Sequence, residues 1–406
     1  MTLLPDAEAS SHPVGFFPAP RAHGLERLRQ FLPAAGRAYA ASRNTDFGPE
    51  RRDNVSCLSP FIRHRLLSEE EVAQAAHGAH GFKGAEKFIQ EVYWRTYFKG
   101  WLEARPHVWS LYRDAVPAAM SGLTAAEEER YSNAVGARTD IECFNHWANE
   151  LIETGYLHNH ARMWFASIWI FTLKLPWVLG ADFFYRHLLD GDAASNTLSW
   201  RWVAGLHTKG KHYVAKASNI NTYTEGRFSP DGQLATSPEP LHDDWNRETA
   251  PGRWPTPLGD LLTPGGPCLL LLHEDDLGAA LNVEGVDVAA VAVLGGQAER
   301  SPFAMGEAVG RFAQEAAADA AERHGSQLVA SVEGVVEFAQ KEGVRTILTP
   351  YAPVGPGADR LARLQEVAKA AGVAIHDFTR PHDLAAWPHC TKGFFALKKK
   401  LPGLLG

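Results

Sequence analysis

The hydrophobic positions of this chain follow two different patterns, one after the other. In the first part apolar residues recur every three or four positions, most clearly from Leu157 to Leu173 and from Phe183 to Leu189, which is the spacing of helices. From Cys268 onward they form short continuous runs separated by helical stretches, as buried parallel strands do. The pattern predicts an α + α/β fold, in which an all-helical domain is followed by a C-terminal α/β domain.

Five apolar runs predict the strands of the second domain: CLLLLH, VAAVAVL, QLVASV, RTILTP and VAIHDF. Helical stretches lie between them, most clearly at Met305–His324, Gly334–Glu342 and Ala358–Ala371. Such alternation predicts a parallel, Rossmann-like sheet with helices on both faces. The first strand, expected at Leu269–His273, is not followed by GxGxxG, so the usual dinucleotide-binding fingerprint is not supported.

Local signals predict several helix boundaries in the first domain. Helices are expected from His23 to about Ser42, over Gly84–Glu103, and from residue 140 to a C-cap at Gly155. Pro176 is expected to end the helix that precedes it. Ser59 reads as the N-cap of a further helix, because a proline follows it. Hydroxyls at such a start can hold a phosphate, although spacing alone favours an ordinary capped helix.

The stretch from Gly155 to Trp202 combines aromatic and charged residues. It holds five of the twelve tryptophans, together with the polar residues Arg162, Asp190, Asp192 and Asn196. Charged groups in so apolar a surrounding need partners, and a ligand is one such partner. For Glu91 and Arg95 no ligand is needed to explain the charges. The two residues lie four positions apart, which allows an ion pair within one helix.

Composition narrows the functional classes. The 406 residues suit two domains, and an apolar fraction of 45% provides a sizeable core. A net charge of −7 does not favour a globally basic nucleic-acid binder, so a DNA contact would need a local patch. Four widely spaced cysteines show no metal or disulfide pattern and suit a cytoplasmic protein. No signal peptide and no membrane-spanning segment is expected.

Two signatures, GYLHNHARM and DGDAASNTLSWRW, resemble the flavin-binding helical domain of the photolyase/cryptochrome family in order and spacing. The resemblance covers roughly Leu25 to Phe228. It implies FAD as cofactor and damaged DNA as partner. The activity it implies is that of a deoxyribodipyrimidine photolyase, a lyase that repairs cyclobutane pyrimidine dimers by electron transfer from excited, reduced FAD. A cryptochrome-like light sensor without repair is the alternative, and a non-catalytic flavoprotein is a third interpretation.

The resemblance also implies roles for individual residues. The flavin would be held by Tyr39, Ser56, Leu58, Ser59, Arg95, Arg162, Asp190, Asp192 and Asn196. The lesion pocket and the reacting flavin edge would be lined by Glu91, Trp94, Asn159, Met163, Asn196 and Trp202. Asn159 and Met163 stand where relatives that repair (6-4) photoproducts carry His, which favours dimer repair, and Asn196 stands where plant cryptochromes carry Asp.

Electron transfer and DNA contact are assigned in the same way. By resemblance Trp200 and Trp177 are the proximal and middle members of an electron-transfer chain, and its distal member has no matching position. The segment Trp200–Lys216 is locally basic, which fits either a DNA-backbone patch or a solvated loop. The DNA contacts would be His160, Arg201, Lys209 and Lys211. His160 departs from the dimer-repair type, which commonly has Arg there.

The order of domains is unusual for this family. Photolyases carry their α/β domain, which in some binds an antenna chromophore, at the N-terminus, whereas here it follows the flavin domain. The sequence does not say whether an antenna chromophore binds. The expected division is a flexible arm (1–20), a helical FAD-binding domain (21–228), a linker (229–267) and an antenna-like α/β domain (268–406), in a monomer. The tail from Thr391 to Leu401 predicts a short basic helix whose lysines are solvated.

Overall fold

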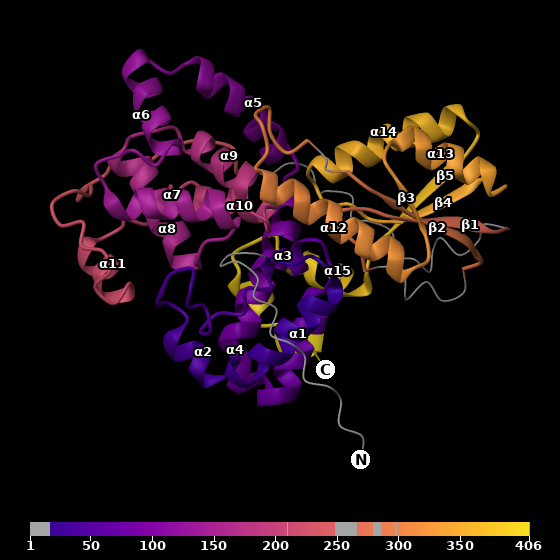
Figure 1. Ribbon diagram of the computed structural model, residues 1–406, viewed down its shortest axis with the longest axis horizontal. Helices are drawn as coiled ribbons and strands as arrows, with labels where there is room; N and C mark the ends of the chain where they lie inside the picture. Colours follow the sequence, from indigo (N-terminus) through magenta and orange to yellow (C-terminus); the bar gives the residue numbers. More distant parts are fainter. Residues whose placement is uncertain (1–16, 209, 248–265, 279–285, 297–298, 406) are drawn as a thin grey trace.

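The structure, a computed structural model, describes residues 17–208, 210–247, 266–278, 286–296 and 299–405 (Figure 1). Most of the expected arm and half of the expected linker lie outside these ranges. A helical part and a sheet flanked by helices follow each other along the chain, and this confirms the predicted fold class (Figure 1). The helices of the first part are α1 (Arg21–Phe31), α2 (Arg37–Ser42), α3 (Ser59–Arg63), α4 (Glu69–Glu103), α5 (His107–Ser121), α6 (Ala125–Val135), α7 (Glu142–Thr154), α8 (Asn159–Ser167), α9 (Trp177–His187), α10 (Ala193–Val203) and α11 (Ala217–Tyr223).

Local chemistry explains where these helices begin and end. Gly155 ends α7 with φ of 68°, a left-handed conformation that favours glycine. Pro176 precedes α9, and the helix before it ends in the π-helical turn Ile168–Thr172, as the proline predicts. The helix expected from His23 to Ser42 is in fact two, because a short 3₁₀ turn containing Pro33 separates α1 from α2. Ser59 is the first residue of α3 and not its N-cap.

The sheet has the strand order β3-β2-β1-β4-β5, and all of its pairs are parallel. The strands are β1 (Cys268–Leu272), β2 (Val288–Leu294), β3 (Gln327–Val329), β4 (Thr346–Pro350) and β5 (Ala374–Phe378). All five lie within or against the predicted apolar runs. The order turns at β1 and β4, so this is a doubly wound sheet of the Rossmann-like kind.

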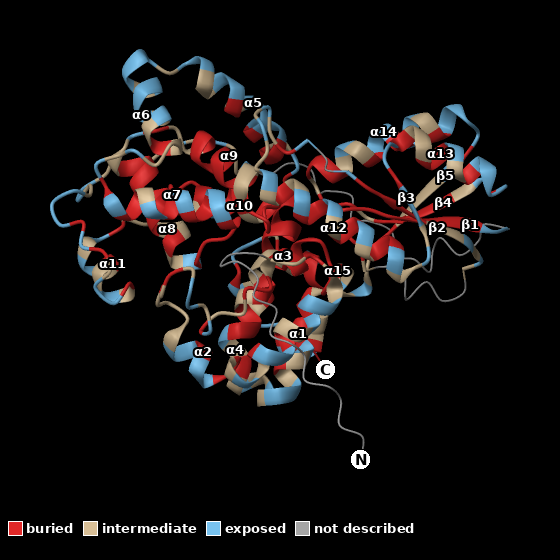
Figure 2. Cartoon of the chain, viewed as in Figure 1, coloured by how far each residue is buried: buried red, intermediate tan, exposed pale blue. Residues whose placement is uncertain are grey.

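The two faces of the sheet are covered by different helices. Along β1, Leu270 and Leu272 belong to the large core that α12 (Glu307–Arg323) shares with the helical part. Leu269 and Leu271 point to the other face, into a separate core with α13 (Val332–Lys341) and α14 (Pro356–Ala370). Strand β1 is buried along its whole length (Figure 2), as expected for a strand that is covered on both faces. One face of the sheet shares its core with the helical part.

After β5 the chain returns to the helical part. Helices α15 (Pro381–Ala386), α16 (Phe395–Lys398) and α17 (Leu401–Leu405) follow, with a 3₁₀ turn at Trp387–His389. Helix α4 packs against α15, α17 and this turn. The buried side chains of Trp387, Phe394 and Leu401 belong to the same core as the helical part. Residues 381–405 are thus spatially part of the helical half, although the sequence assigns them to the α/β domain.

Candidate functional site

A cavity of about 670 Å³ opens between α4, α8, α10 and the segment that precedes α3. Its walls collect residues that are up to 164 positions apart in the chain (Tyr39 to Val203). Most of the residues predicted to form a site line it: Tyr39, Ser56, Leu58, Ser59, Glu91, Trp94, Arg95, Asn159, His160, Arg162, Met163, Asp190, Asn196, Trp200 and Trp202. The fold therefore brings most of the predicted residues together in one place.

One wall of the cavity carries a buried ion pair. Arg162 Nη2 lies 3.0 Å from Asp190 Oδ2, and Arg162 Nε donates to the Leu157 carbonyl oxygen at 2.9 Å. Burial alone would raise the pKa of the Asp190 carboxyl, but Arg162 and Arg95 lower it below its usual range. Burial would likewise lower the pKa of Arg162, and Asp190 raises it. The pair stays charged, with the guanidinium fixed beside the open space.

Asn196, in the first turns of α10, lines the same cavity. Its Nδ2 donates to the Ala181 carbonyl oxygen at 2.7 Å, which leaves the amide oxygen as the group that can accept from a ligand. Asp192, also predicted to bind the cofactor, does not line the cavity. It caps α10 by accepting from Ser195 N at 2.7 Å and forms an ion pair with Arg95. Asp192 therefore positions the wall that carries Asn196.

The residues present fit a flavin nucleotide. Two polar atoms, Ser195 Oγ and Trp200 Nε1, are buried with no hydrogen-bond partner among the described residues, and both side chains line the cavity. Buried donors are almost always satisfied, but neither atom is open to the cavity, so the fit rests on the polar side chains that line it. The hydroxyl groups of Ser56 and Ser59 lie in the same cavity and suit a phosphate, while Tyr39 packs edge-on against Phe88. Sequence reasoning missed Ser195, although it lies within the DGDAASN signature.

The side of the cavity formed by α4 carries the predicted lesion contacts. Glu91 forms an ion pair with Arg43, so the expected intrahelical pair with Arg95 is wrong. Burial raises the pKa of Glu91, and Arg43 only partly offsets this effect. Arg43 was missed because it follows α2 without any motif. Across the cavity, Asn159 Nδ2 lies 3.9 Å from Met163 Sδ.

Trp94 and Trp202 supply flat apolar walls. Trp94 is stacked on Phe394 with ring centroids 4.0 Å apart, and Trp202 lies 6.1 Å from Tyr213 in a nearly parallel arrangement. Both tryptophans are only partly buried, so each keeps a surface toward the cavity. Phe394 could not have been expected from sequence, because it lies 300 positions after Trp94.

The two tryptophans of the predicted electron-transfer chain lie in different surroundings. Trp200 lines the cavity and packs against Phe184 and Trp169, with centroids at 5.1 and 6.2 Å. Trp177 lies outside the cavity lining, next to Trp245 at 5.6 Å. Trp245 belongs to the predicted linker and was not a candidate from sequence. The assignment of Trp200 and Trp177 to an electron-transfer chain stays a prediction.

Of the predicted DNA contacts, one is wrong. Arg201 is fully buried and pairs in bidentate fashion with Asp243 at 2.6 and 2.9 Å, and its guanidinium lies over the ring of Trp245. A residue without exposed surface cannot contact a DNA backbone. Lys211 is exposed, His160 Nδ1 lies 2.7 Å from the Asn44 carbonyl oxygen at the cavity wall, and Lys209 lies outside the described residues.

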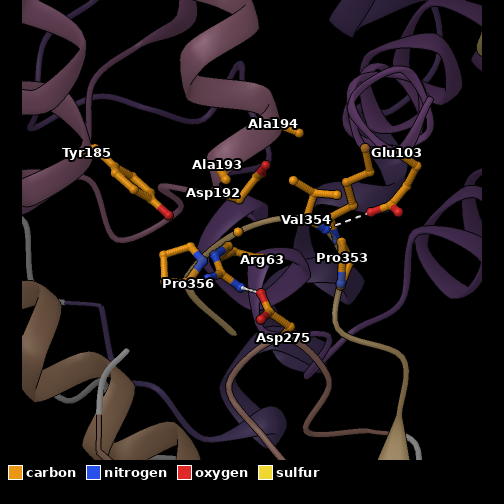
Figure 3. A pocket seen from close by; sticks show the side chains of 12 residues that line it. Arg63, Glu103, Tyr185, Asp192, Ala193, Ala194, Asp275, Pro353, Val354 and Pro356 are labelled. Atoms are coloured by element: carbon orange, nitrogen blue, oxygen red, sulfur yellow. Dashed lines mark hydrogen bonds and ion pairs between the residues drawn. The ribbon is translucent and has the colours of Figure 1, made fainter. Parts of the chain in front are cut away.

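A second cluster of charges lies where β1 and β4 end against α3 and α4 (Figure 3). Arg63 Nη1 contacts Asp275 Oδ1 at 2.6 Å, and Glu103 accepts from Val354 N and Tyr351 Oη, both at 2.7 Å. The space left between these side chains is about 10 Å³, room for about one water molecule. The turning point of a doubly wound sheet is a common ligand site. Here the described side chains fill it.

Within the described ranges, no group of three or more His, Cys, Asp or Glu residues is placed to hold a metal ion. None of the described helices is long and apolar enough to cross a membrane.

Comparison with known proteins agrees with the geometry. Residues 88–237 match the family described as the FAD binding domain of DNA photolyase. Curated relatives include deoxyribodipyrimidine photo-lyases of Thermus thermophilus (31% identical, covering 52% of this chain and 48% of the relative) and Streptomyces griseus (29%, 52% and 47%). A cryptochrome DASH of Vibrio parahaemolyticus is 28% identical over 45% of this chain and 41% of its own length.

Among solved structures, a bacterial class III photolyase from Agrobacterium tumefaciens is similar with a TM-score of 0.43 and 23% identity, covering 51% of this chain and 43% of that chain. The chain spans half or less of the length of these curated relatives. Its helical part is a flavin-binding domain, and the cofactor is FAD. Over this part, the chain is similar to members of the photolyase/cryptochrome family.

Proposed function

We propose that this protein is a light-driven photolyase that splits cyclobutane pyrimidine dimers in DNA. One observation carries the proposal: the cavity that holds the Arg162–Asp190 pair and Asn196 is also lined by Glu91, Trp94 and other lesion-type residues. A dimer inside a duplex is out of reach, so it must be turned out into such a pocket. The cavity offers the volume, flat walls and polar groups that this requires.

When bound, reduced FAD supplies the electron that opens the cyclobutane ring and takes it back afterwards. The protein's own residues orient and protect this exchange. Arg162, held by Asp190, provides a fixed positive charge that stabilises an anionic ring system. The amide oxygen of Asn196, left open because Nδ2 donates to Ala181, would accept a hydrogen bond from a protonated nitrogen of the bound ring system.

The substrate is positioned from the opposite side. Trp94 and Trp202 stack against the two bases and exclude water. Glu91, which Arg43 holds in place, hydrogen-bonds a base edge through its carboxyl oxygens. Asn159 adds a second amide on the same side. These residues need not take part in bond making, because the ring opens once the electron arrives.

The test is repair of a dimer-containing oligothymidine by purified, FAD-loaded protein under blue light with a reductant. We expect loss of dimer in the light only. The double variant Trp202→Ala, Glu91→Gln should keep its flavin and lose repair roughly 100-fold, because it removes one wall and one polar contact. Tyr351→Phe, in the filled crevice, is the matched control and should repair normally. Repair that survives the double variant unchanged would refute the pocket assignment.

A light sensor without repair is the second candidate. It is favoured by the burial of Arg201, which removes a predicted DNA contact, and by His160 in place of Arg. Photoreduction of the flavin together with an untouched dimer in the wild-type protein would support this candidate over repair.

A further inference from the structure

The C-terminal segment, residues 391–400, lies on the outer side of the cavity wall. Phe394 stacks on Trp94, with ring planes 9° from parallel, and Tyr97 Oη donates to the Lys392 carbonyl oxygen at 2.8 Å. Trp94 lines the cavity itself. The segment therefore supports and extends the wall against which a base would stack.

The segment is firmly attached to α4. Phe394 and Leu397 are buried in the core of the helical part. Just before the segment, residues 387–390 approach α4 closely at Gly100, where a Cβ would lie 2.8 Å from both Cys390 Cβ and Trp387 Cδ1. Only glycine allows this approach. The position of the segment beside the cavity is thus fixed by packing.

The outward face of the segment is basic and carries an exposed ring. Lys392, Lys399 and Lys400 are exposed, and Lys398 Nζ pairs with Glu86 Oε1 of α4 at 3.2 Å. Phe395 is 73% exposed, although it adjoins the buried Phe394. On a protein whose net charge is −7, this local cluster of lysines is a place where a polyanion can bind.

Helix α4 continues the same surface. Lys87 is exposed and lies four positions before Glu91 and seven before Trp94, so all three lie on one face of the helix. Lys87 lies close enough to Glu91 to offset part of the rise that burial causes in the pKa of this carboxyl. Lys87 therefore adjoins the wall that carries the predicted substrate contacts, and Lys398 of the segment reaches the same helix through Glu86.

We propose that residues 392–400, with Lys87, bind the phosphate backbone of the DNA strand whose bases enter the cavity, and that Phe395 stacks on a neighbouring base. The inference rests on the proposed function, because it assigns the strand-binding edge of the same cavity. Lysines bind phosphates, and an exposed aromatic ring between them is typical of surfaces that hold an unpaired strand. This edge takes the place of the patch expected around Arg201, which is buried.

The test measures binding of the full-length, FAD-loaded protein in the dark to a labelled duplex with one thymine dimer, at several salt concentrations. Lys392→Ala, Lys399→Ala, Lys400→Ala should bind at least tenfold more weakly. The slope of log Kd against log salt should fall by roughly 2 to 3, at about 0.9 for each lost phosphate contact. Phe395→Ala should weaken binding roughly fivefold with an unchanged slope, because a stacking contact involves no counterion.

The matched control is Lys341→Ala, Arg345→Ala, Lys369→Ala, which removes the same charge from exposed positions of the α/β domain. Binding and slope equal in the two triple variants would overturn the inference, and so would a wild-type protein that binds no DNA. Repair is measured separately in the light. A wild type that binds through these lysines but repairs no dimer would refute the proposed function and leave the DNA-binding edge in place.

Discussion

Two clusters of buried charges in this molecule use the same residue types and differ in the space in front of them. In the cavity, Arg162 and Asp190 face an open volume of about 670 Å³. At the edge of the sheet, Arg63 and Asp275 face about 10 Å³ (Figure 3). Both clusters pair opposite charges, and in both the carboxylate is largely buried. Buried ion pairs alone therefore do not mark a ligand site; groups that remain available to an open volume do.

The largest expected effect is a loss of flavin affinity when the carboxylate of the cavity cluster is removed. Asp190→Asn leaves Arg162 without its carboxylate, so we expect flavin affinity to fall roughly 100-fold. The free energy of unfolding should fall by about 3 kcal/mol, as when one partner of a buried pair is removed. The measurement is bound-flavin absorbance during titration with FAD, together with urea unfolding.

Asp276→Asn, at the residue next to Asp275 where β1 ends, is the control for this comparison. Asp276 Oδ2 lies 2.6 Å from Arg380 Nε and 3.5 Å from Arg65 Nη1, on the sheet side of the interface. This variant should lose about the same stability and keep its flavin affinity. If Asp276→Asn lost flavin as severely as Asp190→Asn, the distinction between the two clusters would be wrong.

Glu103, in the filled crevice, is expected to affect the stability of the protein but not its flavin binding. Burial raises the pKa of its carboxyl from 4.5 to about 7. Between these two pH values the folded protein holds a proton that the unfolded chain has released, so this group makes stability fall as pH rises, with no further change above pH 7. The full change is about 3 kcal/mol.

Glu103→Gln removes this titration. We expect the difference in unfolding free energy, variant minus wild type, to increase from pH 4.5 to pH 7 and then stay level. Buried histidines such as His207, whose pKa burial lowers to about 4, titrate alike in both proteins and cancel in this difference. Urea unfolding across this range measures it. A constant difference would show that Glu103 is ionised throughout.

The fold was largely predictable because its signals are local. Apolar runs of six or seven residues predicted the strands, most directly β1, because a strand buried at every position is continuously hydrophobic. Gly155 and Pro176 marked helix boundaries through their own backbone preferences. The one helix predicted from His23 to Ser42 was wrong, because Pro33 within it was not weighed as a break.

The site was predictable only where a motif supplied the residues. Arg43 was not found as the partner of Glu91, because 48 positions separate them. Arg201 was taken for a surface cation, because its partner Asp243 comes from the predicted linker. Phe394 reaches Trp94 only because the C-terminal segment returns to α4. Each of these contacts depends on tertiary packing, which neither periodicity nor local spacing encodes.

The smallest expected losses of stability come from replacing one glycine in each half of the molecule. Gly155 has φ of 68°, and a Cβ there would lie 2.6 Å from Leu189 Cγ. Its carbonyl oxygen accepts from Leu189 N at 2.9 Å, next to Asp190. Gly155→Ala should therefore cost about 2 kcal/mol from backbone strain and overpacking together, and should weaken flavin binding by shifting Asp190.

Gly343 is the matched control in the α/β half. Its φ is 70°, and nothing lies within 4 Å of an added Cβ, so only the backbone strain remains. Gly343→Ala should cost about 1 kcal/mol and leave flavin binding unchanged. Thermal unfolding and FAD titration of the two variants measure both quantities. Equal losses of stability, with flavin retained in both, would mean that the turn at Gly155 adapts without moving the cavity wall.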